Sequence, residues 1–334
     1  MYKEDIEKIK GKSVLITGGA GFIGSNLAKK LEELGAKVSI FVLPEENLTK
    51  IKDIEDKIKI VRGSLLNELD VVNAVKDKDY LFHFAWQTDL KKSMSNPKQD
   101  ISNDIIGLIN ILESCKDYNK DIKIVFASTV TISGENSKVN SDENVKDEPI
   151  SVYEVNKLFG EKYLHMYYKN YGINYSVLRL SNVFGEGQSI DNPSRGVLNF
   201  MIGRALRGED LTVYGDGKFI RDYCYIGNYL SAFILAAISD KTNGQIHVLG
   251  SGIGRDFNDV VGKIKSITEN LTNREVNIKH IPIPEGEHKI NERNFSADFS
   301  KFSKATGWRP EIDFETGLKK TIEYYWKKEF ENGR

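Results

Sequence analysis

The chain has 334 residues, of which 40% are hydrophobic and 28% charged, a balance typical of soluble globular proteins with one or two domains. Its formal net charge of −1 gives no electrostatic basis for binding nucleic acid or an anionic membrane. Cys115 and Cys224 form no metal-ligand spacing, and the N-terminal stretch MYKEDIEKIK is too charged for a signal peptide, so a cytoplasmic protein is expected.

The first half of the chain alternates predicted strands and helices. Strands are predicted at Ser13–Thr17, Lys37–Leu43, Lys57–Arg62, Tyr80–Ala85 and Ile122–Ser128, and helices at Ser25–Leu34, Leu69–Lys76 and Gln99–Lys116. A long helix from Ser151 to Asn170 and a strand at Tyr175–Leu180 follow. This alternation predicts an α/β fold, a doubly wound parallel sheet covered by helices on both faces.

After Phe184 the pattern is less regular. Glycine-rich turns separate helical patterns at Gly196–Arg207, Ile226–Ile238 and Gly317–Lys328. We therefore expect residues 1–184 to form a cofactor-binding domain that carries the catalytic residues. Residues 185–334 are expected to form mainly a smaller α/β substrate-binding lobe, with the chain free to cross between the two.

A glycine-rich turn at residues 18–24 links the first predicted strand to the first helix. Gly18, Gly21 and Gly24 stand three residues apart, with Phe22 and Ile23 between the last two. Glycines at this spacing permit a tight turn, close approach of a pyrophosphate and close packing of helix on strand. The helix N-terminus adds free N–H groups and a positive dipole end. The motif predicts dinucleotide binding, against the alternative of a plain glycine turn.

The end of the second strand bears on the choice of dinucleotide. An acidic residue usually follows the glycines by about 20 residues and binds the adenosine ribose, but Val42 stands there. Glu45 and Glu46 lie slightly further on, beyond Pro44. No arginine accompanies Val42 in the sequence to favour a 2′-phosphate, so NAD is preferred over NADP.

Tyr153 and Lys157 form the second chemical motif. Residues four apart lie on one face of a helix, so both side chains can enter one cleft. A nearby ammonium and a positively charged nicotinamide would favour the phenolate and lower the pKa of Tyr153. Ser128 and Thr129 follow the strand before this helix and offer the hydroxyl partner. The alternative for Tyr153 and Lys157 is a pair of surface residues without a chemical role. The alternative for Ser128 and Thr129 is that they only cap a strand or turn.

These motifs together resemble the extended short-chain dehydrogenases/reductases, in particular the UDP-glucose 4-epimerase-like nucleotide-sugar epimerase/dehydratase group. The resemblance covers nearly the whole chain. Its segments are TGGAGFIGSNL at 17–27, HFAWQ at 83–87, Ser93 with Pro97, Asn103 to Gly107 matched to N-x-x-G, FAST at 126–129, YEVNK at 153–157, RLSNVFGEG at 179–187, YGDGKFIRDYCYI at 214–226 and ATGWRP at 305–310.

The resemblance implies a Rossmann-type fold and a role for each matching residue. Thr129, Tyr153 and Lys157 would be catalytic: Thr129 binds the reacting sugar hydroxyl, Tyr153 transfers its proton, and Lys157 holds the nicotinamide ribose. Asn182 and Arg221 would join Thr129 in binding the nucleotide sugar, with Arg221 on its diphosphate; a local ion pair with Asp222 is the alternative. The cofactor residues would be Gly18, Gly21, Phe22, Ile23, Gly24, Ser64, Leu65, Ala85, Gln87, Asn103, Tyr153 and Lys157. We expect no metal site. The resemblance also implies that the chain forms a homodimer.

Several positions depart from the family pattern. Ser64 stands where an adenine-binding Asp is common, Trp86 replaces a small residue beside the cofactor, Ser133 replaces a tyrosine, and Asn228 stands near a common Asp. The first leaves adenine recognition open, and the others are expected to reshape the sugar pocket.

One departure concerns the reaction. The family's 4,6-dehydratases carry an Asp-Glu pair directly after the catalytic hydroxyl residue, whereas Val130 and Thr131 follow Thr129 here, and the acid usual in the sugar-acid decarboxylases is also absent. The sequence therefore favours a 4-epimerase that uses NAD and a transient 4-keto sugar. The alternatives are an NAD(P)H-dependent 4-keto-sugar reductase and, more remotely, a non-catalytic cofactor-sensing protein.

Overall fold

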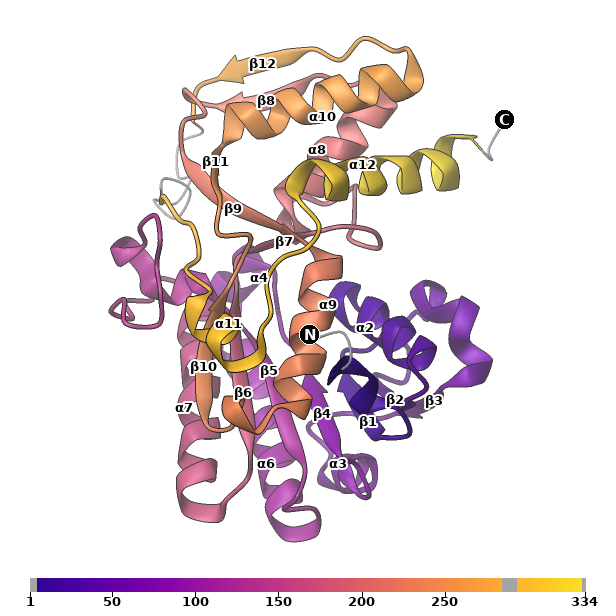
Figure 1. The fold of residues 1–334 in the computed structure, drawn as a ribbon, viewed down its shortest axis with the longest axis vertical. Coiled ribbons are helices and arrows are strands. Elements are labelled where there is room, and N and C mark those ends of the chain that lie inside the picture. The colour runs from indigo at the N-terminus through magenta and orange to yellow at the C-terminus, as the bar shows by residue number, and fades with distance from the viewer. Residues whose placement is uncertain (1–4, 284–292, 332–334) are drawn as a thin grey trace.

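A seven-stranded parallel sheet forms the centre of the larger lobe in the computed structural model, which describes residues 5–283 and 293–331 (Figure 1). The strand order is β10-β6-β5-β4-β1-β2-β3. The bounds are β1 Ser13–Thr17, β2 Lys37–Val42, β3 Lys59–Arg62, β4 Tyr80–His83, β5 Lys123–Thr129, β6 Tyr175–Leu180 and β10 Gln245–Leu249. The predicted α/β fold is confirmed.

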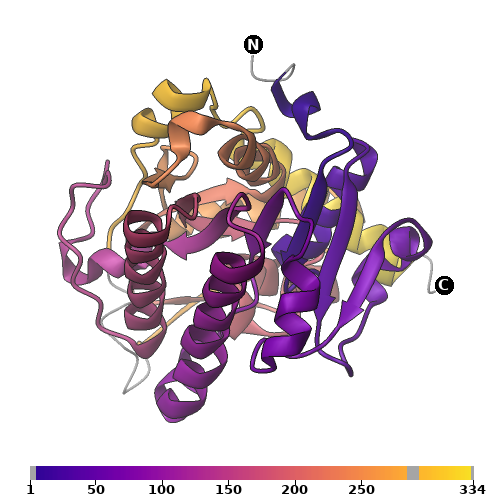
Figure 2. The ribbon, with the colours of Figure 1, turned by 90° about the horizontal axis from the view of Figure 1, so that it is seen from below.

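Apolar side chains on both faces of this sheet explain why helices cover it on both sides (Figure 2). Along β1, Val14 and Ile16 join one buried cluster, while Leu15 between them joins the other. The first cluster includes α2 (Phe22–Glu33) and α9 (Ile226–Ile238). The second includes α3 (Glu68–Val75), α6 (Gly107–Tyr118) and α7 (Val152–Tyr171).

The strand order places a ligand-binding crevice between β1 and β4. The chain runs outward from β1 through β2 to β3 on one side, and from β4 through β5 and β6 to β10 on the other. Ligands of open α/β sheets bind outside the carboxyl ends of the strands at such a reversal. Gly18 and Phe84 directly follow β1 and β4, so the glycine turn lies at this point.

The second lobe lies beyond the carboxyl end of β6 (Figure 1). It contains a three-stranded sheet in the order β11-β9-β7 and a parallel pair of β12 and β8. The bounds are β7 Asn182–Phe184, β8 Leu211–Tyr214, β9 Ile220–Tyr225, β11 Gly254–Asp256, β12 Ile278–Ile281, α8 Val197–Arg207, α10 Phe257–Thr272 and α12 Phe314–Tyr325. Between these elements the chain returns to the large sheet through α9 and β10, and α11 (Ser300–Thr306) also packs there.

The helix predicted at Gln99–Lys116 is three joined segments. α5 (Pro97–Asp100) leads into a π-helical stretch, η3 (Ile101–Ile106), and then into α6. The stretch changes which residues face α7, because a π turn shifts the helical register. α4 (Leu90–Ser95) precedes these segments. The 3-10 stretch η2 (Thr49–Lys57) connects β2 to β3, and η4 (Val130–Asn136) lies between β5 and α7.

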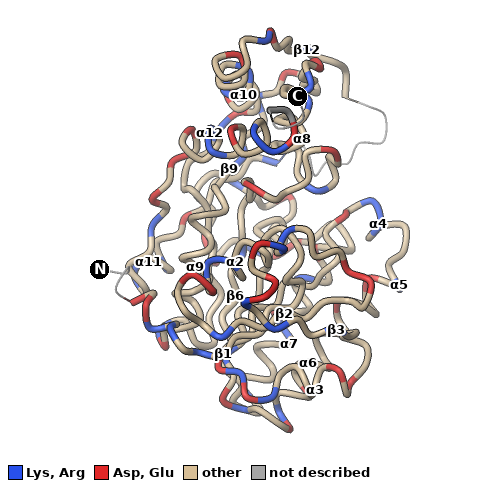
Figure 3. The backbone as a smooth tube through the Cα atoms, turned by 90° about the vertical axis from the view of Figure 1, so that its right-hand side faces the viewer, with Lys and Arg blue, Asp and Glu red and all other residues tan. Residues whose placement is uncertain are grey.

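Charge is spread over both lobes. Figure 3 shows acidic and basic positions interspersed along the tube, as the net charge of −1 implies. Among the described helices none has the length and apolarity needed to cross a bilayer.

Candidate active site

The turn from β1 to α2 forms a cradle that only glycine can line. Gly18 has a φ of +66°, and a Cβ on it would lie 2.8 Å from the amide nitrogen of Ala85. A Cβ on Gly24 would lie 2.3 Å from the carbonyl oxygen of Gly18. Gly21 caps α2 without a side-chain hydrogen bond, so the N–H groups of Phe22 and Ile23 begin the helix. This cradle fits the pyrophosphate of a dinucleotide.

The end of the crevice that is predicted to hold the adenosine has two residues that sequence reasoning missed. Asp70 accepts a hydrogen bond from the Ser64 amide at 3.0 Å, so a carboxylate stands beside Ser64 after all. Arg62 pairs in register with Val42 and donates Nη1 to the carbonyl oxygens of Leu43 at 3.2 Å and Pro44 at 2.5 Å. The arginine absent from the sequence around Val42 is therefore supplied by the neighbouring strand.

The remaining predicted cofactor residues lie on both sides of the crevice. Leu65 contacts the start of α6, where Asn110 donates to its carbonyl at 2.8 Å. The Ala85 amide donates to Thr17 at 3.3 Å, which holds Ala85 close to Gly18. Gln87 follows and donates its amide to Asp104 at 3.0 Å.

Asn103 was matched to the wrong position of N-x-x-G. The spacing places the motif's first residue three before Gly107, which is Asp104. In the structure Asn103 is exposed on η3, whereas Asp104 is buried and faces Gln87. Counting the spacing correctly would have found it.

Thr129 and Tyr153 are brought together at the carboxyl end of β5. Burial raises the pKa of Tyr153, and a hydrogen bond with the Thr129 side chain acts in the opposite direction. This direction is opposite to the predicted lowering of the Tyr153 pKa, because burial is the largest influence on the phenol. Thr129 also shares a 2.9 Å hydroxyl–hydroxyl contact with Thr131. Ser128 points elsewhere and donates to Glu161 at 2.6 Å, so Thr129 is the available hydroxyl.

Lys157 is buried one helical turn beyond Tyr153. Its Nζ donates to the carbonyl of Ala127 at 2.6 Å and lies 4.1 Å from the ring centroid of Trp86 and 4.5 Å from that of Phe126. Burial lowers the pKa of Lys157 to about 7, against the opposing charges of Asp104 and Glu161. A lysine that can lose its charge near neutral pH is typical of functional sites.

A capping box fixes the first turn of α7, which carries Tyr153. Ser151 accepts from the Glu154 amide at 3.3 Å, and Glu154 Oε2 accepts from the Ser151 amide at 3.2 Å. Arg293 donates Nη1 to the same glutamate at 3.0 Å and to the carbonyl of Thr131 at 2.9 Å. Sequence reasoning missed Arg293 because no local pattern signals that this distant segment reaches α7.

Two of the predicted substrate residues, Asn182 and Arg221, lie on the second lobe, whereas Thr129 ends β5. Asn182 is exposed at the start of β7, opposite Tyr223 of β9. Arg221 lies on β9 over the ring of Phe219, 5.0 Å from its centroid. Burial lowers the pKa of Arg221, and the charge of Arg293 acts in the same direction, so the two guanidinium groups are within electrostatic range.

Asp222 does not form the surface ion pair considered as an alternative for Arg221. It is completely buried and accepts hydrogen bonds from the amides of Ser251 at 2.8 Å, Gly252 at 3.0 Å and Ala297 at 3.0 Å. Successive residues of a strand point to opposite faces, which separates its carboxylate from the Arg221 side chain. Asp222 thus anchors two loops.

The glycine after Ser133 and the departure at Asn228 have structural explanations. A Cβ at Gly134, which has a φ of +56°, would lie 1.8 Å from the carbonyl oxygen of Glu148, so the turn after Ser133 requires glycine. Asn228 is buried: it donates to the carbonyl of Ile312 at 2.8 Å and accepts from the amides of Glu311 and Ile312 at 3.0 Å. Asn228 therefore holds the C-terminal segment against α9.

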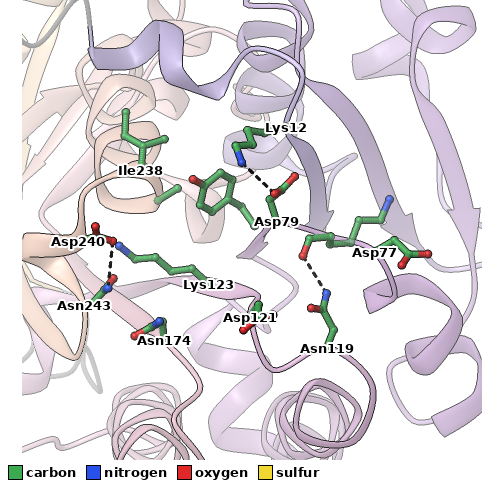
Figure 4. Close-up of a pocket in the computed structure, with 13 residues that line it drawn as sticks. Lys12, Asp77, Asp79, Asn119, Asp121, Lys123, Asn174, Ile238, Asp240 and Asn243 are labelled. Atoms are coloured by element: carbon green, nitrogen blue, oxygen red, sulfur yellow. Dashed lines mark hydrogen bonds and ion pairs between the residues drawn. The ribbon is translucent and has the colours of Figure 1, made fainter.

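A separate cavity of about 490 Å³ lies at the opposite, amino-terminal edge of the sheet (Figure 4). Its lining mixes acidic and basic side chains, among which Lys12 and Asp79 pair at 3.2 Å. Lys123, also in the lining, donates to the carbonyl of Ser239 at 2.7 Å. No cluster of His, Cys, Asp and Glu suited to a metal ion occurs in the described part of the chain. The chemistry-bearing residues gather at the carboxyl edge instead.

Comparison with known proteins identifies relatives of this chain. The family model described as GDP-mannose 4,6 dehydratase matches residues 15–321. A putative UDP-glucose 4-epimerase from Methanocaldococcus jannaschii is 32% identical, over 93% of this chain and 97% of that protein. The structure of UDP-glucose 4-epimerase with UDP-glucose from Thermotoga maritima superposes with a TM-score of 0.84 at 32% identity, covering 95% of this chain and 99% of that one. The Thermus thermophilus UDP-glucose 4-epimerase complex with NAD gives a TM-score of 0.80 at 28% identity, with 94% and 98% covered.

Proposed function

Since the chain belongs to the nucleotide-sugar epimerase/dehydratase family of extended short-chain dehydrogenases/reductases, we propose that it is an NAD-dependent nucleotide-sugar 4-epimerase. Related proteins named UDP-glucose 4-epimerase cover almost its whole length. The reaction within the family is our inference, because the matching family model carries the name of a dehydratase.

The glycine cradle supports NAD as the cofactor. Gly18, Gly21 and Gly24 leave room for a pyrophosphate beside the N-terminus of α2, and the Thermus thermophilus relative was solved with NAD. Bound NAD supplies a nicotinamide that accepts a hydride from the sugar carbon and returns it. Gln87 and Lys157 lie further along the same crevice, on the side of Thr129 and Tyr153.

The chain's own residues move one proton and orient the substrate. Thr129 hydrogen-bonds the C4 hydroxyl of the sugar and holds it toward Tyr153. The Tyr153 phenolate removes the proton of that hydroxyl as C4 is oxidised, which gives the 4-keto sugar and the neutral phenol. After the ketose turns over, Tyr153 gives the proton back to the oxygen as C4 is reduced on its other face. Lys157 is proposed to hold the nicotinamide ribose, and the positive charge of a bound nicotinamide would favour the Tyr153 phenolate.

One observation favours epimerisation over dehydration: no carboxyl group follows Thr129. Val130 packs in a buried cluster with Val248, Phe295 and Ala297, and the Thr131 hydroxyl contacts that of Thr129 at 2.9 Å. The nearby carboxylate of Glu154 is occupied by Arg293 and the amides before α7. Proton transfer at C5 and C6 of the sugar, which dehydration needs, has no acid or base at these positions.

The second lobe is proposed to bind the nucleotide diphosphate. Arg221 of β9 supplies a guanidinium group, and such groups bind phosphate by charge-assisted hydrogen bonds. Asn182 is exposed at the junction between the two lobes.

A cytoplasmic homodimer is also proposed. Large apolar side chains are exposed along η3 and α7, including Ile106 at 43%, Phe159 at 52% and Tyr171 at 45%. Such residues on neighbouring helices suit a helix-on-helix interface. The two thiols, of Cys115 and Cys224, are free and buried, as suits a reducing compartment.

Incubation with UDP-, GDP-, dTDP- and CDP-sugars without added cofactor tests the reaction. An epimerase converts one of them to its 4-epimer of equal mass, detected by NMR. A product that has lost water would indicate a dehydratase, and one that has lost carbon dioxide a decarboxylase. Reduction of a 4-keto sugar only with added NAD(P)H would identify a reductase.

A further inference from the structure

The surroundings of Lys157 contain two groups that the proposed mechanism does not use. The first is the indole of Trp86, whose ring centroid lies 4.1 Å from the ammonium nitrogen. The ring also packs edge-on against Phe126, with centroids 5.1 Å apart. Lys157 Nζ therefore lies against two ring faces and donates to one carbonyl, that of Ala127.

The second group is the carboxyl of Asp104. Its Oδ1 accepts the Gln87 amide at 3.0 Å, and its Oδ2 is buried with no hydrogen-bond partner among the described residues. Asp104 is only 2% exposed and lies on η3, which packs against α7. A buried carboxylate oxygen without a donor is costly unless a nearby charge compensates it. Burial raises the pKa of the Asp104 carboxyl to about 7, and the charge of Lys157 acts against this rise, just as the charge of Asp104 acts against the lowering of the Lys157 pKa by burial.

The other charged groups around Lys157 are already occupied or neutral. Glu161, one turn further along α7, accepts both Arg179 and Ser128. His83 of β4 bonds Thr17 at 2.7 Å, and burial lowers its pKa to about 3, which keeps it neutral. The charge of Asp100 on α5 raises the pKa of Asp104. Asp104 thus offers the ammonium a buried carboxyl oxygen that has no other partner among the described residues.

We propose that Trp86 and Asp104 are positioning residues that together hold Lys157 in its charged form, Trp86 through its ring face and Asp104 through its carboxylate. An ammonium over an indole face is attracted by the negative face of the ring, most strongly where water is excluded. A carboxylate nearby favours the charged form in the same way. The importance of this arrangement for catalysis rests on the proposed function, but the arrangement itself does not.

Titration of Lys157 by NMR, with lysine labelled at the ε carbon, tests the proposal without any turnover. The Lys157→Met variant identifies the signal. In the wild type, burial lowers the pKa of Lys157, and the charges of Asp104 and Glu161 oppose this. Asp104→Asn keeps the shape of the side chain but removes the charge, and the midpoint should fall by about one pH unit. Asp100→Asn is the matched control, and its midpoint should stay within about 0.3 units of wild type by the same argument.

Two substitutions of Trp86 separate the contribution of its ring from that of its apolar bulk. Trp86→Leu keeps the site apolar but removes the ring, and the Lys157 midpoint should fall by about one unit. Trp86→Phe retains a ring face and should recover at least half of that loss. A midpoint that stays or rises in both Asp104→Asn and Trp86→Leu would overturn the proposal. Since Asp104→Asn is nearly isosteric, it remains decisive if Trp86→Leu does not fold.

An activity measurement links the arrangement to the reaction. If the proposed function is correct, the turnover of Asp104→Asn should lose its high-pH limb about one unit earlier than wild type, with KM for the sugar nucleotide unchanged. A shifted Lys157 titration in a protein that shows no epimerase activity would leave the positioning role intact and reject only the proposed function. An unshifted titration would reject the positioning role, whatever the activity.

Discussion

The guanidinium of Arg293 donates from Nη1 and Nη2 to one oxygen of Glu154, each at 3.0 Å. Both side chains are nearly inaccessible, at 8% and 1% exposure. Glu154 follows Tyr153 directly in the first turn of α7, and Arg293 lies in the chain segment that returns from the second lobe. The pair therefore couples the position of the proposed proton-transfer residue to the C-terminal part of the chain.

Arg293→Met should destabilise the protein strongly. The change leaves the Glu154 carboxylate buried without its partner, a situation that typically costs about 3–5 kcal/mol. Urea unfolding followed by circular dichroism measures the effect as a lower midpoint. Lys319→Met removes an exposed partner of Glu323 and should leave the midpoint nearly unchanged. Equal midpoints for Arg293→Met and wild type would show that the pair contributes nothing.

Gly24→Ala should weaken NAD binding far more than the control substitution Gly262→Ala does. The added Cβ would lie 2.3 Å from the Gly18 carbonyl, so the turn must open. We expect NAD affinity, measured by calorimetry, to fall at least about tenfold, or ~1.4 kcal/mol. Gly262→Ala in α10 has no atom within 4 Å of its new Cβ, and it should bind NAD normally. Wild-type affinity in Gly24→Ala would move the pyrophosphate away from this turn.

NAD should bind more tightly than NADP, although Arg62 lies beside the adenosine end of the crevice. Its guanidinium already donates to the carbonyls of Leu43 and Pro44, which ties it to the loop after β2. Titration of both dinucleotides into wild type and Arg62→Ala separates the two roles. If Arg62 only holds the loop after β2, Arg62→Ala should change the affinities for NAD and NADP by a similar factor. NADP bound more than tenfold tighter than NAD, with this preference lost in Arg62→Ala, would assign Arg62 to a 2′-phosphate.

Arg221→Ala should weaken the binding of the nucleotide sugar by about 2–4 kcal/mol, as expected for truncating one partner of a buried charge pair with phosphate. Affinity is measured by calorimetry in the presence of NAD. Arg207→Ala serves as the control, because Arg207 pairs with Asp191 and Glu209 at the surface. Unchanged affinity in Arg221→Ala would place the diphosphate elsewhere.

Much of the fold could be predicted because its signals are local. The strands at Ser13–Thr17 and Tyr175–Leu180 and the helix at Ile226–Ile238 have the predicted bounds, since apolar runs and turn residues mark them. The π-helical stretch after Asp100 could not be predicted, because its register depends on packing against α7.

The site was predicted less completely, because several of its contacts join distant segments. Val42 suggested that no arginine lies near the adenosine, yet parallel pairing brings Arg62 to that position. The expected lowering of the Tyr153 pKa assumed that Lys157 faces it, whereas burial dominates and Lys157 lies against Trp86. The division at residue 184 stays a prediction, with β10 returning to the large sheet.

The comparison of Tyr153→Phe with wild type tests the central claim most directly. The substitution keeps the ring and removes the oxygen that interacts with Thr129, so folding and NAD binding should survive. Tyr324→Phe, an exposed position on α12, is the matched control. With saturating NAD and the sugar nucleotide that wild type converts, turnover of Tyr153→Phe should fall at least about 100-fold, the lower end for losing a general acid–base group. Turnover within about threefold of wild type, with NAD and substrate bound normally, would contradict the mechanism.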